Sequence, residues 1–223
     1  MHNFTISINP IAEFTTATPG KKRSIVKQQL NPPKVLIARY RTARASMLKS
    51  IKNGVSEKEV LAGIERLQGR VPATDFQRSD IKNSIEALRC FLKLRFPEEF
   101  KSIKCSFPKS DVKSIELAGI NILVAPDLIL KWTNAGKAYV GGIKFHISRS
   151  GMFEVENSKC VAAGLRMFLE KNVAGKGETV DPNFCLSVEV FGERVTRAPI
   201  NYKEYIAKLA QACQEINRML KAA

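Results

Sequence analysis

The sequence has few of the residues from which metal centres and disulfide frameworks are built. Among its 223 residues are two histidines, His2 and His146, and five cysteines that stand far apart with no CxxC pair. This spacing argues against a zinc site made of cysteine and histidine, and the odd cysteine count favours reduced thiols in the core. The cysteines are Cys90, Cys105, Cys160, Cys185 and Cys213.

Long apolar runs are also missing. No stretch approaches the roughly 20 residues of a membrane helix, and the opening MHNFTISINPIAEF lacks the basic segment and apolar block of a secretory signal. The apolar content of 44% and the charged content of 26% are typical of a globular protein. We therefore expect a cytoplasmic protein of one or two domains that has no membrane partner.

Several catalytic motifs are absent as well. The sequence contains no GxxxxGK[ST] loop and no GxSxG elbow, and its Gly141-Gly142 pair does not form a dinucleotide fingerprint. A cysteine nucleophile would need a histidine partner, for which His146 is a weak candidate. These absences argue against P-loop nucleotide hydrolysis, dinucleotide binding and serine or cysteine acyl transfer.

Acidic residues are nearly missing from the first 52 positions. This segment holds ten lysines and arginines but one acid, Glu13, and so supplies +9 of the net charge of +15. A run of charge is often only a solvated face, but the lack of compensating acids favours contact with a polyanion. We expect nucleic acid as the partner, with DNA favoured over RNA. The candidate binding residues are Lys21, Lys22, Arg23, Lys27, Arg39, Arg41, Arg44 and Lys49.

Apolar residues recur at helical spacing through the first hundred positions. Ser56 and Glu59 have the spacing of a capping box, which predicts where one helix begins. We expect residues 1–78 to form a basic helical region and residues 79–223 to form an α/β core. The predicted helices of this part are Arg23–Leu30, Lys34–Asn53, Ser56–Leu67 and Ser79–Arg95.

The later part of the chain mixes strands with helices. Ile115–Trp132 is rich in Ile, Leu and Val and predicts two strands or one bent strand. The turn sequence TNAG then predicts a hairpin between Asp127–Trp132 and Lys137–Ser148. The remaining predicted elements are a helix at Asn157–Lys171, strands at Phe184–Phe191 and Arg194–Pro199, and a helix at Asn201–Leu220.

Two charged residues stand out in these predicted strands. Asp127 follows Pro126 at the head of one strand, and Lys144 lies inside the next. With the order of helices and strands over about Ser79 to Pro199, this pattern resembles the PD-(D/E)xK superfamily of restriction-endonuclease-like nucleases. The resemblance implies an α/β fold with a restriction-endonuclease-like core, in which a central mixed sheet is flanked by helices. It also implies that Asp127 binds Mg²⁺ or Mn²⁺ and that Lys144 orients or activates the attacking water.

One of the three signature groups is missing, because Gly142 occupies the position of the second acid. Strand alternation places residue 142 on the same face as Lys144. A single carboxylate holds Mg²⁺ weakly, since this ion prefers octahedral oxygen ligands. Glu189 is the preferred substitute as a metal ligand and catalytic group because of its place on a strand. Glu86 and Glu116 are the other candidates, and for each the simpler interpretation is a solvated carboxylate.

The simpler interpretation of Asp127 and Lys144 is an ion pair that neutralises two charges within a largely apolar sheet. The leading hypothesis is therefore a nucleic-acid-binding protein with a degenerate nuclease site. An active Mg²⁺- or Mn²⁺-dependent DNA nuclease completed by Glu189 or Glu86 is the first alternative. A non-enzymatic subunit that docks an acidic protein is the second, and homo-oligomer formation stays open.

Overall fold

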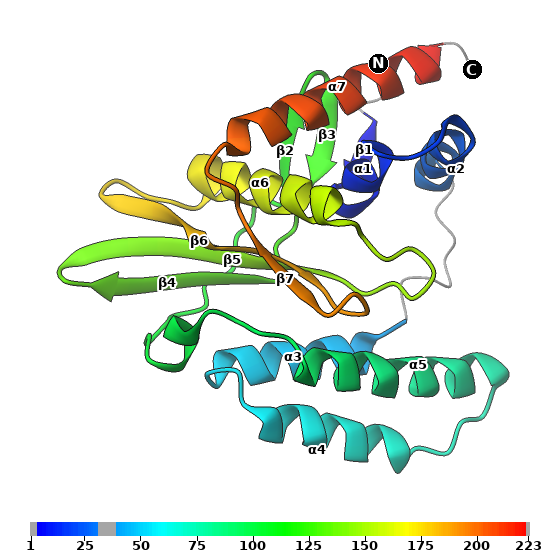
Figure 1. The fold of residues 1–223 in the computed structure, drawn as a ribbon, viewed down its shortest axis with the longest axis vertical. Helices are drawn as coiled ribbons and strands as arrows, with labels where there is room; N and C mark the ends of the chain where they lie inside the picture. The colour runs from blue at the N-terminus through cyan, green and yellow to red at the C-terminus, as the bar shows by residue number, and fades with distance from the viewer. Residues whose placement is uncertain (1–3, 31–38, 222–223) are drawn as a thin grey trace.

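A four-stranded mixed sheet lies at the centre of the fold (Figure 1). In the computed structural model, which describes residues 4–30 and 39–221, β4 (Leu128–Asn134) and β5 (Lys137–His146) form an antiparallel hairpin. β6 (Glu178–Glu189) lies parallel to β5, and β7 (Arg194–Arg197) lies antiparallel to β6. The helix α6 (Val155–Asn172) makes the crossover from β5 to β6.

The predicted hairpin is confirmed. Ala135 and Gly136 have φ values of 47° and 75°, as a two-residue turn of the primed type requires. The preceding Asn134 pairs with Lys137, and the ladder continues to Leu128 opposite Ile143.

A second sheet of three strands lies beside the first. It consists of β1 (Thr5–Ser7), β3 (Ile120–Leu123) and β2 (Ser114–Leu117), in that spatial order. The segment predicted to hold at most two strands therefore holds three, because Ala118 and Gly119 turn the chain with φ values of 48° and 77°. β1 and the helix α1 (Ile8–Phe14) that follows it were not predicted.

The predicted helices are present with shifted ends. They are α2 (Pro19–Leu30), α3 (Arg41–Lys52), α4 (Glu57–Gln68), α5 (Asp75–Leu92), α6 and α7 (Tyr202–Lys221). A short 3₁₀ helix at Glu98–Lys101 was not predicted. α5 begins early because the Thr74 hydroxyl accepts a hydrogen bond from Gln77 N at 3.2 Å. Residues 34–38 of the predicted second helix lie outside the described residues.

The capping box predicted at Ser56 is wrong. The Ser56 side chain makes no capping hydrogen bond, although α4 does begin at the next residue. The Glu59 carboxylate instead lies 2.7 Å from Lys49 Nζ and accepts a hydrogen bond from Asn53 Nδ2 at 2.9 Å. The acid that was expected to cap α4 therefore joins α4 to α3.

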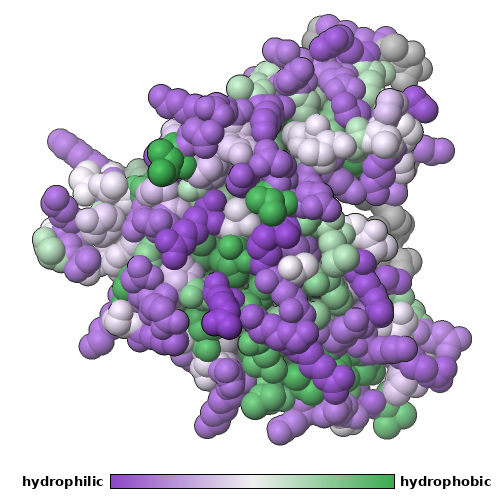
Figure 2. Space-filling model, in the orientation of Figure 1, coloured by the Kyte–Doolittle hydropathy of each residue, from purple (hydrophilic) through white to green (hydrophobic). Residues whose placement is uncertain are grey.

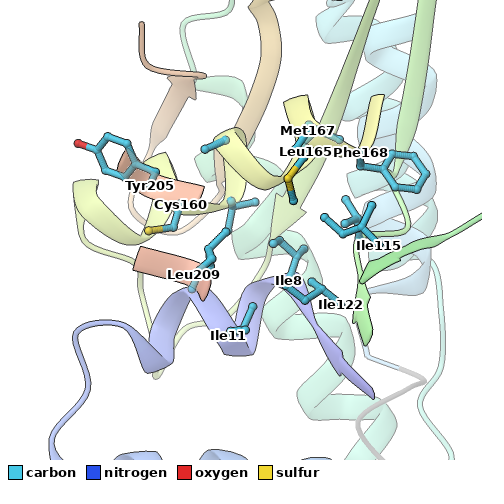
Figure 3. Close-up of a cluster of buried hydrophobic side chains, with 14 of the residues drawn as sticks. Ile8, Ile11, Ile115, Ile122, Cys160, Leu165, Met167, Phe168, Tyr205 and Leu209 are labelled. Atoms are coloured by element: carbon cyan, nitrogen blue, oxygen red, sulfur yellow. The ribbon is translucent and has the colours of Figure 1, made fainter. Parts of the chain in front are cut away.

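Helices cover both faces of the four-stranded sheet (Figure 1). On one face α1, α6 and α7 enclose a core in which Ile8 and Ile11 of α1 lie near Leu209 of α7 and Ile122 of β3 (Figure 3). On the other face, α3, α4 and α5 pack against apolar side chains of β4, β5 and β6. Between the sheet and this lower helical layer, hydrophobic residues are visible at the surface (Figure 2).

Both cores contain residues from before and after position 78, the predicted end of the helical region. Ile8 packs in the core that contains α6 and α7, while Met47 and Val60 pack with Leu88 against the sheet. Cys160, Cys185 and Cys213 are buried in the first core, and burial raises the pKa of the Cys213 thiol to about 12. Within the described residues, no helix combines the length and the apolar character needed to cross a membrane.

Candidate functional site around Asp127 and Lys144

Asp127 extends the pairing of β4 with β5 by one further residue. Its backbone N–H donates to Ile143 O at 2.8 Å, and its carboxylate oxygen Oδ2 accepts a hydrogen bond from Phe145 N at 2.8 Å. The same oxygen lies 3.8 Å from Lys144 Nζ. The two side chains therefore converge, as the strand pattern predicted.

Lys144 projects from the sheet face that carries α6. Its ammonium donates to Ala125 O at 2.7 Å, and its side chain is 13% exposed. Burial lowers the pKa of Lys144, and the Asp127 carboxylate partly opposes this by stabilising the charged form. The lysine is thus held by a carbonyl and a carboxylate inside the protein.

A second cation reaches Asp127 from α3. Arg44 Nη1 donates to Asp127 Oδ1 at 2.7 Å, where the arginine side chain is 44% exposed and the aspartate side chain 5%. Arg44 was predicted as a nucleic-acid contact, and its pairing with Asp127 was not predicted. One buried carboxylate is therefore shared by two cations from different elements.

Asn9 of α1 completes the surroundings of Phe145. Its side-chain Nδ2 donates to Phe145 O at 2.9 Å, while Asp127 accepts from the N–H of the same residue. These two side chains satisfy the backbone of β5 at the point where β4 no longer runs alongside it. Asn9 was not predicted as a site residue, although an amide within the apolar segment INPIAEF was a signal for a buried contact.

The position of the missing acid faces apolar side chains. A Cβ added at Gly142 would lie 3.1 Å from Leu169 Cδ1 and 3.3 Å from Leu165 Cδ1, both on α6. The oxygens of Asp127 are already bonded to a guanidinium and a backbone amide. These surroundings do not fit a Mg²⁺ or Mn²⁺ ion, which requires several oxygen ligands at one point.

Glu189 is buried but is bonded elsewhere. In the register of β5 and β6 it lies opposite His146, whereas Lys144 lies opposite Ser187. Its Oε2 is hydrogen-bonded to His146 Nδ1 and accepts from Phe153 N at 3.0 Å. The Phe153 ring stacks on the imidazole with a centroid separation of 3.5 Å. Glu189, the preferred substitute acid, thus forms a cluster with His146. It lies on β6, whereas Lys144 lies on β5, the strand next to Asp127.

Replacing Glu189 with alanine is expected to lower the free energy of unfolding by about 2–3 kcal/mol, because the buried Phe153 N–H and the imidazole lose their acceptor. Glu189→Gln keeps one carbonyl oxygen and should lose less. Urea unfolding followed by circular dichroism measures both variants. If the two variants are as stable as the parent protein, the cluster does not contribute to folding.

The other candidate acids lie apart from Asp127. Glu86 of α5 forms an ion pair with Arg149 at 2.9 Å. Glu116 is exposed on β2, in the three-stranded sheet. Neither has a contact with Asp127 among the hydrogen bonds and ion pairs of the described residues.

The predicted nucleic-acid contacts fall into two groups. α2 and α3 lie on opposite sides of the four-stranded sheet (Figure 1), so their basic residues do not form one surface. On α2, Lys21 and Lys22 form ion pairs with Glu13 at 3.0 Å and Glu215 at 2.7 Å. Three other predicted contacts, Arg23, Lys27 and Arg41, are exposed. Arg39 lies over the Phe76 ring. Lys49 forms an ion pair with Glu59, and Arg44 forms one with Asp127.

A hollow that was not predicted from the sequence borders Asp127. Its volume is about 360 Å³, and Leu48 and Ile129 are among its lining residues. Three lysines also line it, namely Lys52, Lys109 and Lys113. Only Lys52 belongs to the basic N-terminal segment. The other two lie in residues 101–113, which hold four lysines and one acid and were not predicted as a binding segment.

A scan against models of known protein families and a search of curated proteins find no match to this sequence. The geometry of the chain therefore carries the functional argument.

Proposed function

We propose that this protein binds nucleic acid through the cationic surface that includes α3, and that its nuclease-like residues form a structural ion-pair cluster. The proposal places the chain with non-cleaving relatives of the PD-(D/E)xK fold. DNA is the favoured partner, and the protein acts without Mg²⁺ or Mn²⁺.

One observation carries the proposal: the carboxylate of Asp127 is neutralised internally, while lysines around the neighbouring hollow are left without acids. Arg44 and Lys144 hold the carboxylate at 2.7 Å and 3.8 Å. Across residues 4–30 and 39–221, no carboxylate lies within ion-pair distance of Lys52, Lys109 or Lys113. Uncompensated cations of this kind attract phosphate groups.

The affinity for DNA is expected to fall steeply with salt, because each phosphate contact releases counterions. Fluorescence anisotropy with a labelled oligonucleotide, repeated from low to high salt, measures the slope of log affinity against log salt concentration. Arg41→Glu should weaken binding more than the matched reversal Lys21→Glu. The reason is that Lys21 is already paired with Glu13 at 3.0 Å, whereas Arg41 is exposed.

An affinity that does not change with salt would contradict this proposal. Incubation with plasmid and Mg²⁺ or Mn²⁺ tests the nuclease alternative in the same preparation. Cleavage that disappears in both Asp127→Asn and Lys144→Met would support an active nuclease, whereas cleavage that persists in both indicates a contaminant. A protein that copurifies in equal amounts, with no affinity for nucleic acid, would support the interaction subunit.

A further inference from the structure

Two adjoining hollows form a groove between α3 and the segment 101–113. The first, of about 360 Å³, borders Asp127, and the second, of about 350 Å³, borders Gly54 and Phe100. Both are lined by Lys52 and Phe107, whose ammonium and ring centroid lie 5.6 Å apart. These two residues border both hollows, so the hollows adjoin and are together called the groove.

Cations dominate the rim of this groove. Among the described residues that line the two hollows are five lysines and one acid, Asp127. Lys101 pairs with Glu98 at 2.8 Å, and the Asp127 carboxylate is neutralised by Arg44. The five lysines are Lys52, Lys101, Lys104, Lys109 and Lys113.

The floor of the groove is apolar and includes one aromatic ring. Leu48, Pro108 and Val112 line the first hollow together with Phe107, and Val112 is 47% exposed. Phe107 is half-buried, so part of its ring is accessible. A ligand that fits this surface carries flat or apolar groups together with negative charges.

Both walls of the groove are held in place by the fold. Along α3, Arg44, Leu48 and Lys52 recur every four residues and so form one row, about 12 Å from the first to the last. On the opposite wall, Ser106 N donates to Lys131 O at 2.8 Å, and Lys113 O accepts from Ala125 N at 2.8 Å. Lys52 and Lys113 therefore project from anchored backbone, which limits the entropy lost on binding.

We infer that this groove binds a single-stranded segment of nucleic acid, with phosphates on the lysines and a base stacked on Phe107. This inference rests on the proposed function and assigns its binding site. Unpaired bases offer their faces to an aromatic ring, whereas a duplex keeps them stacked inside. The lysine rim and apolar floor match the backbone and bases of one strand.

The experiment measures binding of a fluorescent deoxythymidine oligonucleotide by anisotropy across a salt series. The double reversal Lys109→Glu and Lys113→Glu should lower the slope of log affinity against log salt by at least about 1.4, or about 0.7 for each lysine. The matched control is Lys82→Glu with Lys176→Glu, which changes the net charge equally at exposed positions outside the groove. The control should keep most of the slope.

Phe107→Leu tests the stacking separately. Leucine keeps the apolar contact but removes the ring, so the affinity for the oligonucleotide should fall on the order of ten-fold. The parent protein should bind a duplex of equal length more weakly than it binds the single strand. Phe107→Leu should change the affinity for the duplex little. Thermal unfolding of each variant verifies that the fold is retained.

The possible outcomes separate the binding site from the proposed function. If the Lys109/Lys113 double reversal and Phe107→Leu both leave salt-dependent binding unchanged, the groove is not the binding site, although the protein still binds nucleic acid. Absence of binding to single strands and to duplexes alike would overturn both. Equal affinity for duplex and single strand, or tighter binding of polyglutamate that depends on Phe107, would also overturn the single-strand assignment.

Discussion

Gly142→Asp is expected to lower the free energy of unfolding by about 3–5 kcal/mol and to create no nuclease. The substitution would complete the sequence motif of the PD-(D/E)xK superfamily, because it places an acid two residues before Lys144. In the fold, the new Cβ would lie 3.1 Å from Leu169 Cδ1 and 3.3 Å from both Leu165 Cδ1 and Leu128 O. A carboxylate there would enter the apolar contact between β5 and α6, where an unpaired charge is costly.

Gly142→Ala is the matched control for this prediction. It adds the Cβ without the carboxylate and should cost about 1–3 kcal/mol, the usual range for an overfilled core. Urea unfolding of the parent protein and both variants gives the two differences. If the aspartate variant were as stable as the parent and cleaved plasmid with Mg²⁺, the site would be a nuclease centre that had lost one ligand, and the structural interpretation would be wrong.

Asp127→Ala is expected to lower the free energy of unfolding by about 3 kcal/mol, because Lys144 then stays buried without its carboxylate. The Phe145 N–H also loses its acceptor. Arg44→Ala, by contrast, removes a partner that is 44% exposed. It should cost about 1 kcal/mol, because the half-exposed arginine is well solvated and the carboxylate keeps Lys144 and the Phe145 N–H as partners.

The second substitution Lys144→Met distinguishes the charge from the packing. Added to Asp127→Ala, it removes the uncompensated ammonium and should recover part of the lost stability. Chemical unfolding of the single and double variants gives the coupling between the two positions. If the loss of unfolding free energy in the double variant equals the sum of the losses in Asp127→Ala and Lys144→Met, the two residues act independently.

The hairpin and the meeting of Asp127 with Lys144 were predictable because both depend on local rules. Side chains alternate along a strand, and a short turn determines which residues lie opposite each other. Arg44 and Asn9 were not predictable as partners of this site. They lie 83 and 136 residues from the groups that they contact, and no periodicity of the sequence encodes such pairings.

Glu189 illustrates the same limit. Its position on the strand face opposite to the apolar residues of β6 could be inferred from alternation, and the structure bears this out. Its burial could not, since it depends on an imidazole 43 residues away. The groove was missed for a related reason: four of its lysines lie in residues 101–113, and they meet Lys52 only because this segment lies against α3.

The parallel pairing of β1 with β3 has a consequence for synthesis on the ribosome. Thr5–Ser7 can join its sheet only after Ile120–Leu123 has emerged, and Asn9 must wait for Phe145. Until then Ile6, Ile8 and Ile11, all buried in the finished protein, stay open to water and to other nascent chains. Contacts of such long range fold slowly and prolong this exposure. The burial of this segment therefore waits for parts of the chain that are synthesised much later.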